Sequence, residues 1–169
     1  MKPARMAAAL GEAAIGREAR SLPEDHGTVR LWLRLLSCST QIEQSIRSRL
    51  RQRFATTLPR FDYLAQLERH PEGLRMKQLS HYLMVSGGNV TGLTDQLEAE
   101  GWVVRTPDPE DRRSWILQLT PQGRQQFLAM AAEHEAWLVE LLGGFAGGDR
   151  LYELLGQLRL HLNDMEQKQ

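Results

Sequence analysis

Residues 74–123 read LRMKQLSHYLMVSGGNVTGLTDQLEAEGWVVRTPDPEDRRSWILQLTPQG, and this stretch decides the fold. Within it, apolar residues first recur at helical spacing, which predicts a short helix over 76–83 and a second helix over 86–100. Ser86 is suited to cap the second helix, and Gly101 is suited to end it.

The spacing of the apolar residues changes after Gly101. Alternating residues predict two strands, 102–105 and 114–119, joined by a turn over 106–111 that is rich in proline and acidic residues. A hairpin that directly follows two short helices forms the wing of a winged helix-turn-helix, with the second helix turned outward. The inward residues of that helix would be Val90, Leu93 and Leu97.

Longer helices flank this stretch on both sides. Apolar residues at every third or fourth position predict helices over 28–54 and 57–69 before it, and over 121–142 and 149–165 after it. Their expected N-cap residues are Thr57, Thr120 and Asp149. The chain is therefore expected to be mostly α (α+β), a winged helix-turn-helix with long terminal helices.

The composition is typical of one soluble globular domain. The chain has 169 residues, of which 41% are hydrophobic and 25% are charged. No apolar run is long enough to cross a membrane, no secretory signal is evident, and the single cysteine, Cys38, fits a reducing cytoplasm. The sequence shows no phosphate-binding loop, nucleophile elbow or metal-ligand cluster, so we expect neither an enzyme nor a cofactor or metal site.

Charge is unevenly distributed along a chain whose formal net charge is zero. Residues 57–123 hold seven Lys and Arg against nine Asp and Glu, so this region is slightly acidic. Any contact with nucleic acid must therefore use local clusters of basic residues. Because few phosphates can be neutralised, we expect DNA affinity to depend only modestly on salt concentration.

The outward face of the 86–100 helix carries small and polar side chains. Amide side chains pair with adenine in the major groove, hydroxyl groups bind bases or phosphates, and glycines let the backbone approach closely. Arginines at a hairpin tip reach a minor groove or phosphates. The candidate DNA-binding residues are Ser86, Gly87, Gly88, Asn89, Thr91, Gly92, Gln96, Arg112 and Arg113.

These residues resemble the MarR family of bacterial transcriptional regulators. Asp111-Arg112-Arg113, Leu119-Thr120 and Gly123 are similar to the wing pattern of the family. The upstream positions that also match are Val85-Ser86, Asn89-Val90-Thr91, Asp95, Leu97-Glu98 and Gly101-Trp102-Val103. Where the recognition helix of relatives often carries basic residues, this chain has Gly87, Gly92 and Gln96.

The resemblance implies a cytoplasmic homodimer whose first and last helices interlock, bound to a pseudo-palindromic operator on double-stranded DNA. Residues 1–26 would be an N-terminal arm and 27–169 a single domain. Within that domain, 28–54 and 121–167 would supply the dimerisation helices and 57–123 the DNA-binding region. The terminal helices also carry more apolar residues than one small winged domain can cover, which favours a partner chain.

The resemblance further implies repression that is relieved by a small, often aromatic, ligand. Residues 31–38, 58–62 and 84–93 look most like relatives that govern aromatic-acid breakdown, some of which sense hydroxycinnamoyl or benzoyl coenzyme A thioesters. Aromatic walls suit aromatic effectors, and arginines suit the phosphates of coenzyme A. The candidate ligand-binding residues are Trp32, Arg34, Cys38, Arg60, Phe61 and Tyr63.

Three alternatives stay open. Winged helices also bind proteins, and the acidic balance of the region permits a protein-interaction module. Cys38 could sense oxidation, as thiols do in some relatives, although its apolar helix segment favours a packing role. Arg112 and Arg113 could instead pair, as solvated charges, with the three acidic residues of 108–111.

Overall fold

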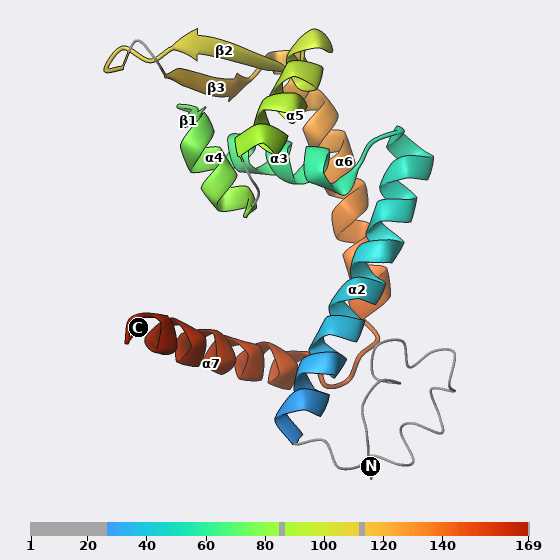
Figure 1. Ribbon diagram of the computed structural model, residues 1–169. Helices are drawn as coiled ribbons and strands as arrows, with labels where there is room; N and C mark the ends of the chain where they lie inside the picture. The colour runs from blue at the N-terminus through green and yellow to red at the C-terminus, as the bar shows by residue number, and fades with distance from the viewer. Residues whose placement is uncertain (1–26, 85–86, 112–113, 169) are drawn as a thin grey trace. The chain divides into compact units, whose positions relative to one another are not determined.

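The computed structural model describes residues 27–84, 87–111 and 114–168 (Figure 1). The chain falls into two compact units, Met1–Phe127 and Leu128–Gln169. The predictions made for Ser86, for Arg112 and Arg113, and for the arm 1–26 lie outside the described residues.

Apart from the short strand β1, the elements follow the order predicted from the sequence, with ends that differ from the prediction by a few residues. In chain order they are α2 (Gly27–Phe54), α3 (Leu58–Arg69), β1 (Leu74–Arg75), α4 (Met76–Leu83), α5 (Gly87–Ala99), β2 (Val103–Pro107), β3 (Trp115–Leu119), α6 (Pro121–Leu142) and α7 (Gly148–Glu166). The boundary between the two units lies inside α6. None of the helices in the described part of the chain is long and apolar enough to cross a membrane. The predicted fold, a winged helix-turn-helix between long helices, is confirmed.

A third strand completes the wing sheet, and the sequence pattern did not predict it. β1 pairs with β3 in antiparallel register, with Leu74 opposite Leu117 and Arg75 opposite Ile116. The sheet order is therefore β1-β3-β2, and the expectation of a lone hairpin was wrong. A strand of two residues is too short to show an alternating pattern, and it exists here because β3 offers a free edge.

The core of the first unit is built from the C-terminal part of α2, from α3, α4 and α5, and from the sheet. Its fully buried side chains include Leu50, Tyr63, Leu64, Leu79, Val90, Leu97 and Leu117. Of the three residues predicted to point inward from α5, Val90 and Leu97 are buried and Leu93 is half-buried. Thr94, which was not predicted, is fully buried, because its hydroxyl donates to the Val90 carbonyl at 2.7 Å.

The predicted helix caps differ in outcome. The Thr120 hydroxyl caps α6, because it accepts a hydrogen bond from the Gly123 N–H at 2.9 Å. Thr57 occupies the N-cap position of α3, but its side chain makes no capping hydrogen bond. The prediction for Asp149 was wrong, since Gly147 is the N-cap of α7 and Asp149 lies in its first turn. A carboxylate there still faces the positive end of the helix dipole.

Gly123 marks the closest approach between α6 and the start of the hairpin. A Cβ at this position would overlap the carbonyl oxygen of Trp102, which is itself held by the Thr120 N–H at 3.0 Å. We expect Gly123→Ala to lower the free energy of unfolding by about 3 kcal/mol or more, since two backbone segments would have to separate. Urea denaturation measures this loss.

Gly101→Ala is the matched control. Gly101 has a φ of 74°, but a Cβ there meets only the flexible end of Gln122. The expected cost is therefore about 1 kcal/mol, for the left-handed backbone alone. Equal losses in the two variants would contradict the steric argument.

Candidate nucleic-acid interface

The inner side of α5 is held by a buried hydrogen bond to α3. The Tyr63 and Thr94 hydroxyl oxygens lie 2.7 Å apart, and both side chains are fully buried. Because the single Thr94 proton is directed to the Val90 carbonyl, Tyr63 is the donor in this pair. Burial raises the pKa of Tyr63 to about 12, so the phenol keeps its proton at neutral pH.

Ion pairs hold the second half of α5 against its neighbours. Arg105 of β2 pairs with Asp95 and, at 2.8 Å, with Glu98. Arg60 of α3 pairs with Glu100, one residue beyond the end of α5. These contacts join α5 to both β2 and α3, so its orientation in the first unit is fixed.

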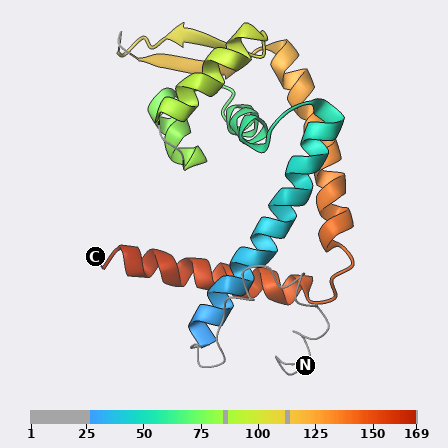
Figure 2. The same ribbon diagram turned by 45° about the vertical axis from the view of Figure 1, so that its right-hand side comes forward.

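The opposite side of α5, the yellow-green helix of Figures 1 and 2, is exposed and carries the described candidate residues. Asn89, Gly92 and Gln96 share one face, because they follow one another at helical spacing. The Thr91 hydroxyl donates to the Gly87 carbonyl at 3.1 Å and keeps its lone pairs for another donor. The candidates that the structure describes as exposed are Gly87, Gly88, Asn89, Thr91, Gly92 and Gln96.

The glycines of α5 are not required by the packing of the protein. A Cβ added at Gly87, Gly88 or Gly92 meets no atom within 4 Å, and none of these residues has a positive φ. Glycine inside a helix costs about 0.5–1 kcal/mol relative to alanine. Packing within the described part of the chain therefore gives no reason for glycine at these positions.

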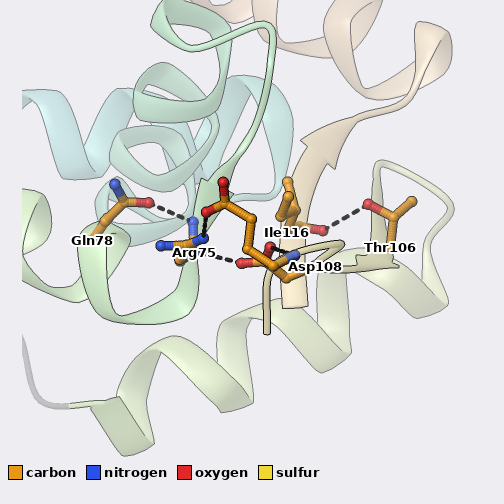
Figure 3. Close-up of polar contacts among 6 residues, drawn as sticks. Arg75, Gln78, Thr106, Asp108 and Ile116 are labelled. Atoms are coloured by element: carbon orange, nitrogen blue, oxygen red, sulfur yellow. Dashed lines mark hydrogen bonds and ion pairs between the residues drawn. The ribbon is translucent and has the colours of Figure 1, made fainter. Parts of the chain in front are cut away.

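Asp108 organises the turn between the wing strands. Its side chain is buried, with 2% of the residue exposed, and it pairs with Arg75 (Figure 3). The same carboxylate accepts the Glu110 N–H at 2.9 Å, and the Asp108 N–H donates to the Ser114 carbonyl at 3.1 Å. The hydrogen bond from the Arg75 guanidinium, followed by that from the Glu110 N–H, holds the pKa of Asp108 below its ordinary value.

This network leaves fewer free partners for the alternative in which Arg112 and Arg113 pair with the acidic residues of 108–111. Arg75 also reaches the Glu110 carboxylate at 2.9 Å, so two of the three acidic residues offered as partners for Arg112 and Arg113 already pair with Arg75. No sequence signal singled out Arg75, because 33 residues separate it from Asp108 and only the fold brings them together.

The six predicted ligand-binding residues do not form one pocket in the single chain. Trp32, Arg34 and Cys38 lie on the first half of α2, about 24–33 Å along the helix from its end, where α3 follows. Trp32 is 60% exposed and Cys38 is exposed, so the cysteine does not pack into a core within the single chain, and its packing role stays a prediction.

The other three predicted ligand residues belong to α3 and serve the winged unit. Phe61 is buried, and its ring centroid lies 5.5 Å from that of Phe127. Tyr63 is bonded to Thr94 in the core, as described above. Arg60 pairs with Glu100, and its guanidinium lies 5.3 Å from the centroid of the Trp102 ring.

A cavity of about 250 Å³ lies elsewhere in the first unit. It is lined by Leu67, Glu68, Pro71, Leu119, Thr120, Pro121 and Arg124. The Arg124 and Glu68 side chains in its wall pair with each other at 2.8 Å. None of the predicted ligand residues lines it. In the part of the chain that the structure describes, no group of His, Cys, Asp or Glu could hold a metal ion.

Comparisons with known proteins agree with this geometry. The model of the MarR family matches residues 56–115. Over 128 residues the chain is 32% identical to the transcriptional activatory protein BadR of Rhodopseudomonas palustris, which covers 74% of this chain and 73% of the relative. A crystal structure of a MarR family transcriptional regulator from Silicibacter pomeroyi is 32% identical, with a TM-score of 0.69, over 86% of this chain and 99% of that one.

More distant structures share the fold. Sco3205 of Streptomyces coelicolor, a MarR family regulator in complex with DNA, has a TM-score of 0.73 at 19% identity, over 86% of this chain and 92% of that one. CouR of Rhodococcus jostii RHA1, bound to p-coumaroyl-CoA, has a TM-score of 0.67 at 21% identity, over 86% and 94%. The chain belongs to the MarR family, whose members are DNA-binding transcriptional regulators.

The lowered pKa of Asp108 predicts how the stability of the wing depends on pH. The carboxylate stabilises the fold above its unfolded pKa of 3.8, and this contribution is lost as the pH falls through the lower folded value. Asp108→Asn should therefore be less stable than the wild type at neutral pH, with the difference shrinking in acid. Denaturation from pH 7 to pH 2 measures it. A difference that stays constant over this range would contradict the ion pair.

Proposed function

We propose that this chain is a homodimeric repressor that reads a pseudo-palindromic operator with α5 and the wing. A small aromatic ligand, or its coenzyme A thioester, releases the repressor from DNA and so induces genes for the breakdown of aromatic compounds. The observation that carries the DNA-reading part is the two-sided character of α5. Its inner side is anchored by Tyr63, Arg105 and Arg60, while the described candidate residues on its outer side are exposed.

The exposed face of α5 suits the major groove. A recognition helix enters with its N-terminal residues first, and there Gly87 and Gly88 leave the backbone bare. The Asn89 and Gln96 amides have the donor and acceptor pair that adenine presents. Ser86 at the helix start and Arg112 and Arg113 at the wing are assigned from the sequence alone.

Internal ion pairs reduce the charge that the DNA-binding region can offer. Of its seven basic residues, Arg60, Arg75 and Arg105 are paired with carboxylates of the same unit. Specific contacts must therefore supply much of the affinity, together with the second copy in a dimer.

Exposed apolar residues on two helices support the dimer. On α2, Leu31 and Trp32 are 53% and 60% exposed. On α7, which has no buried residue, Leu160 and Leu162 are 67% and 53% exposed. An isolated helix of this length is marginal in water, and apolar patches of this kind mark contact surfaces. A second copy of the chain is the simplest cover for them.

The effector part of the proposal draws on α2 and on the comparisons. Trp32 and Cys38 are exposed in the single chain, so they are available to a ligand that binds where two copies meet. CouR, with the same fold, is bound to p-coumaroyl-CoA. Arg34 and Arg60 are the proposed partners of carboxylate or phosphate groups.

Gln96→Ala and Gly92→Ala test the DNA-reading face. The probe is the duplex that the wild-type protein selects from a randomised pool. Gln96→Ala should weaken binding about tenfold, since a bidentate pair contributes about 1–3 kcal/mol. Gly92→Ala should weaken binding while raising the free energy of unfolding by about 0.5–1 kcal/mol, because only the DNA side lacks room for a methyl group.

Gln125→Ala is the matched control, because Gln125 is exposed on α6, outside the proposed interface. It should bind the duplex like the wild type. Arg113→Ala separates the proposal from a protein-interaction module, because it should abolish DNA binding and leave the dimer intact. Unchanged binding in the Gln96, Gly92 and Arg113 variants would overturn the DNA-reading assignment.

The effector is tested by mobility shift with aromatic acids and their coenzyme A thioesters. An aromatic compound should release the duplex from the wild type, whereas coenzyme A and acetyl-CoA should not. Arg34→Ala, which removes a proposed partner of the effector's carboxylate or phosphate, should bind the duplex like the wild type and lose the response. If no aromatic compound releases the duplex, the effector assignment fails while the DNA assignment stands.

A transcription assay tests the repressor assignment. The name of the relative BadR describes that protein as an activator, and activation by this protein would overturn the repressor assignment.

A further inference from the structure

Arg75 stands where three elements of the first unit meet. It is the last residue of β1 and the N-cap residue of α4, and its side chain reaches the turn of the wing. Through β1 it pairs with Ile116 of the central strand. One residue therefore links the first helix of the helix-turn-helix to both ends of the hairpin turn.

Both the backbone and the side chain of Arg75 are engaged (Figure 3). Its N–H donates to the Gln78 side chain at 2.9 Å, which closes the first turn of α4. Its guanidinium pairs with Asp108 through Nε and with Glu110 through Nη2, the latter at 2.9 Å. An arginine fork that meets two carboxylates fixes direction as well as distance.

The two carboxylates are not equivalent. The Asp108 side chain is 1% exposed and that of Glu110 is 80% exposed, while the Arg75 side chain is 42% exposed. Asp108 follows the last residue of β2 and also binds the backbone of the turn. The guanidinium therefore binds the wing at the buried Asp108, where the turn begins, and the exposed Glu110 supplies a second ion pair.

We propose that Arg75 is a positioning residue for DNA binding, which sets the wing turn relative to α4 and α5 and does not itself contact DNA. The inference rests on the proposed reading of DNA by α5 and the wing. If α5 and the wing contact adjacent segments of one duplex, the distance between them must be fixed. A shift of the wing relative to α5 would prevent both from making their contacts at the same time. The Arg75 contacts supply that constraint from a position outside both readers.

A half-exposed arginine could instead contact a DNA phosphate. Variants of its acidic partners, Asp108 and Glu110, distinguish this role from the positioning role. If Arg75 bound phosphate, Asp108→Asn and Glu110→Gln would free the guanidinium and tighten DNA binding. If Arg75 positions the wing, loss of Asp108 releases the turn and weakens binding. The two roles thus predict changes of opposite sign.

The experiment uses the full chain and the duplex selected by the wild-type protein. Arg75→Met, which keeps the length of the side chain, and Asp108→Asn should each weaken binding about tenfold. In a hydroxyl-radical footprint both should lose protection at the outer edges of each half-site and keep it at the centre, where α5 binds. The double variant should bind about as well as the more weakly binding of the two single variants, because both changes break the same Arg75–Asp108 ion pair. Arg75→Lys should recover part of the loss.

Arg124→Met is the control, since Arg124 is an arginine of similar exposure that pairs with Glu68 outside the wing. It should bind and footprint like the wild type. Tighter binding by Asp108→Asn, an unchanged footprint in Arg75→Met, or a footprint weakened evenly along the site would each overturn the positioning role. Arg75→Met leaves the buried Asp108 carboxylate without its arginine partner, so thermal denaturation must show that the variant is folded at the temperature of the binding assay. A wild-type footprint without protection from α5 would instead overturn the proposed function.

Discussion

The winged unit depends on the central position of β3. This strand pairs with β2 along its length and with β1 at its other edge, and its Leu117 is fully buried beneath the helices. The pairing with β2 forms the wing, and the pairing with β1 fixes the point at which α4 begins. Because one strand carries both contacts, the helix-turn-helix and the wing form a single body and not two parts joined by a loop.

The same body gives α5 two different sides. On the inner side, Thr94 faces the core and its hydroxyl is hydrogen-bonded to Tyr63 and to the Val90 carbonyl, so a polar group is buried without an unpaired donor. On the outer side, the glycines lower helix stability, and the described residues give no packing reason for them. The contacts on the buried side of α5 offset the helix stability that the exposed glycines remove.

Charge follows the same division of roles. Arg60 and Arg105 pair with carboxylates on or just after α5, and Arg75 pairs with Asp108 of the wing turn. This use of arginine accounts for a DNA-binding region with slightly acidic overall balance. Three of the seven basic residues of 57–123 are therefore engaged in ion pairs inside the unit.

The sequence by itself determined the helices, the hairpin and the outward residues of α5, because apolar spacing and local stop signals such as Gly101 act over a few residues. It also gave the family, through an ordered set of short matches across 85–123. Only the tertiary structure decided the role of Arg75, the burial of Thr94 and Asp108, the strand β1 and the exposure of Cys38. Each of these features depends on whether residues distant in the sequence lie beside it in the fold. Local pattern carries no information about such a partner, because the fold alone brings residues 33 positions apart within reach of a hydrogen bond.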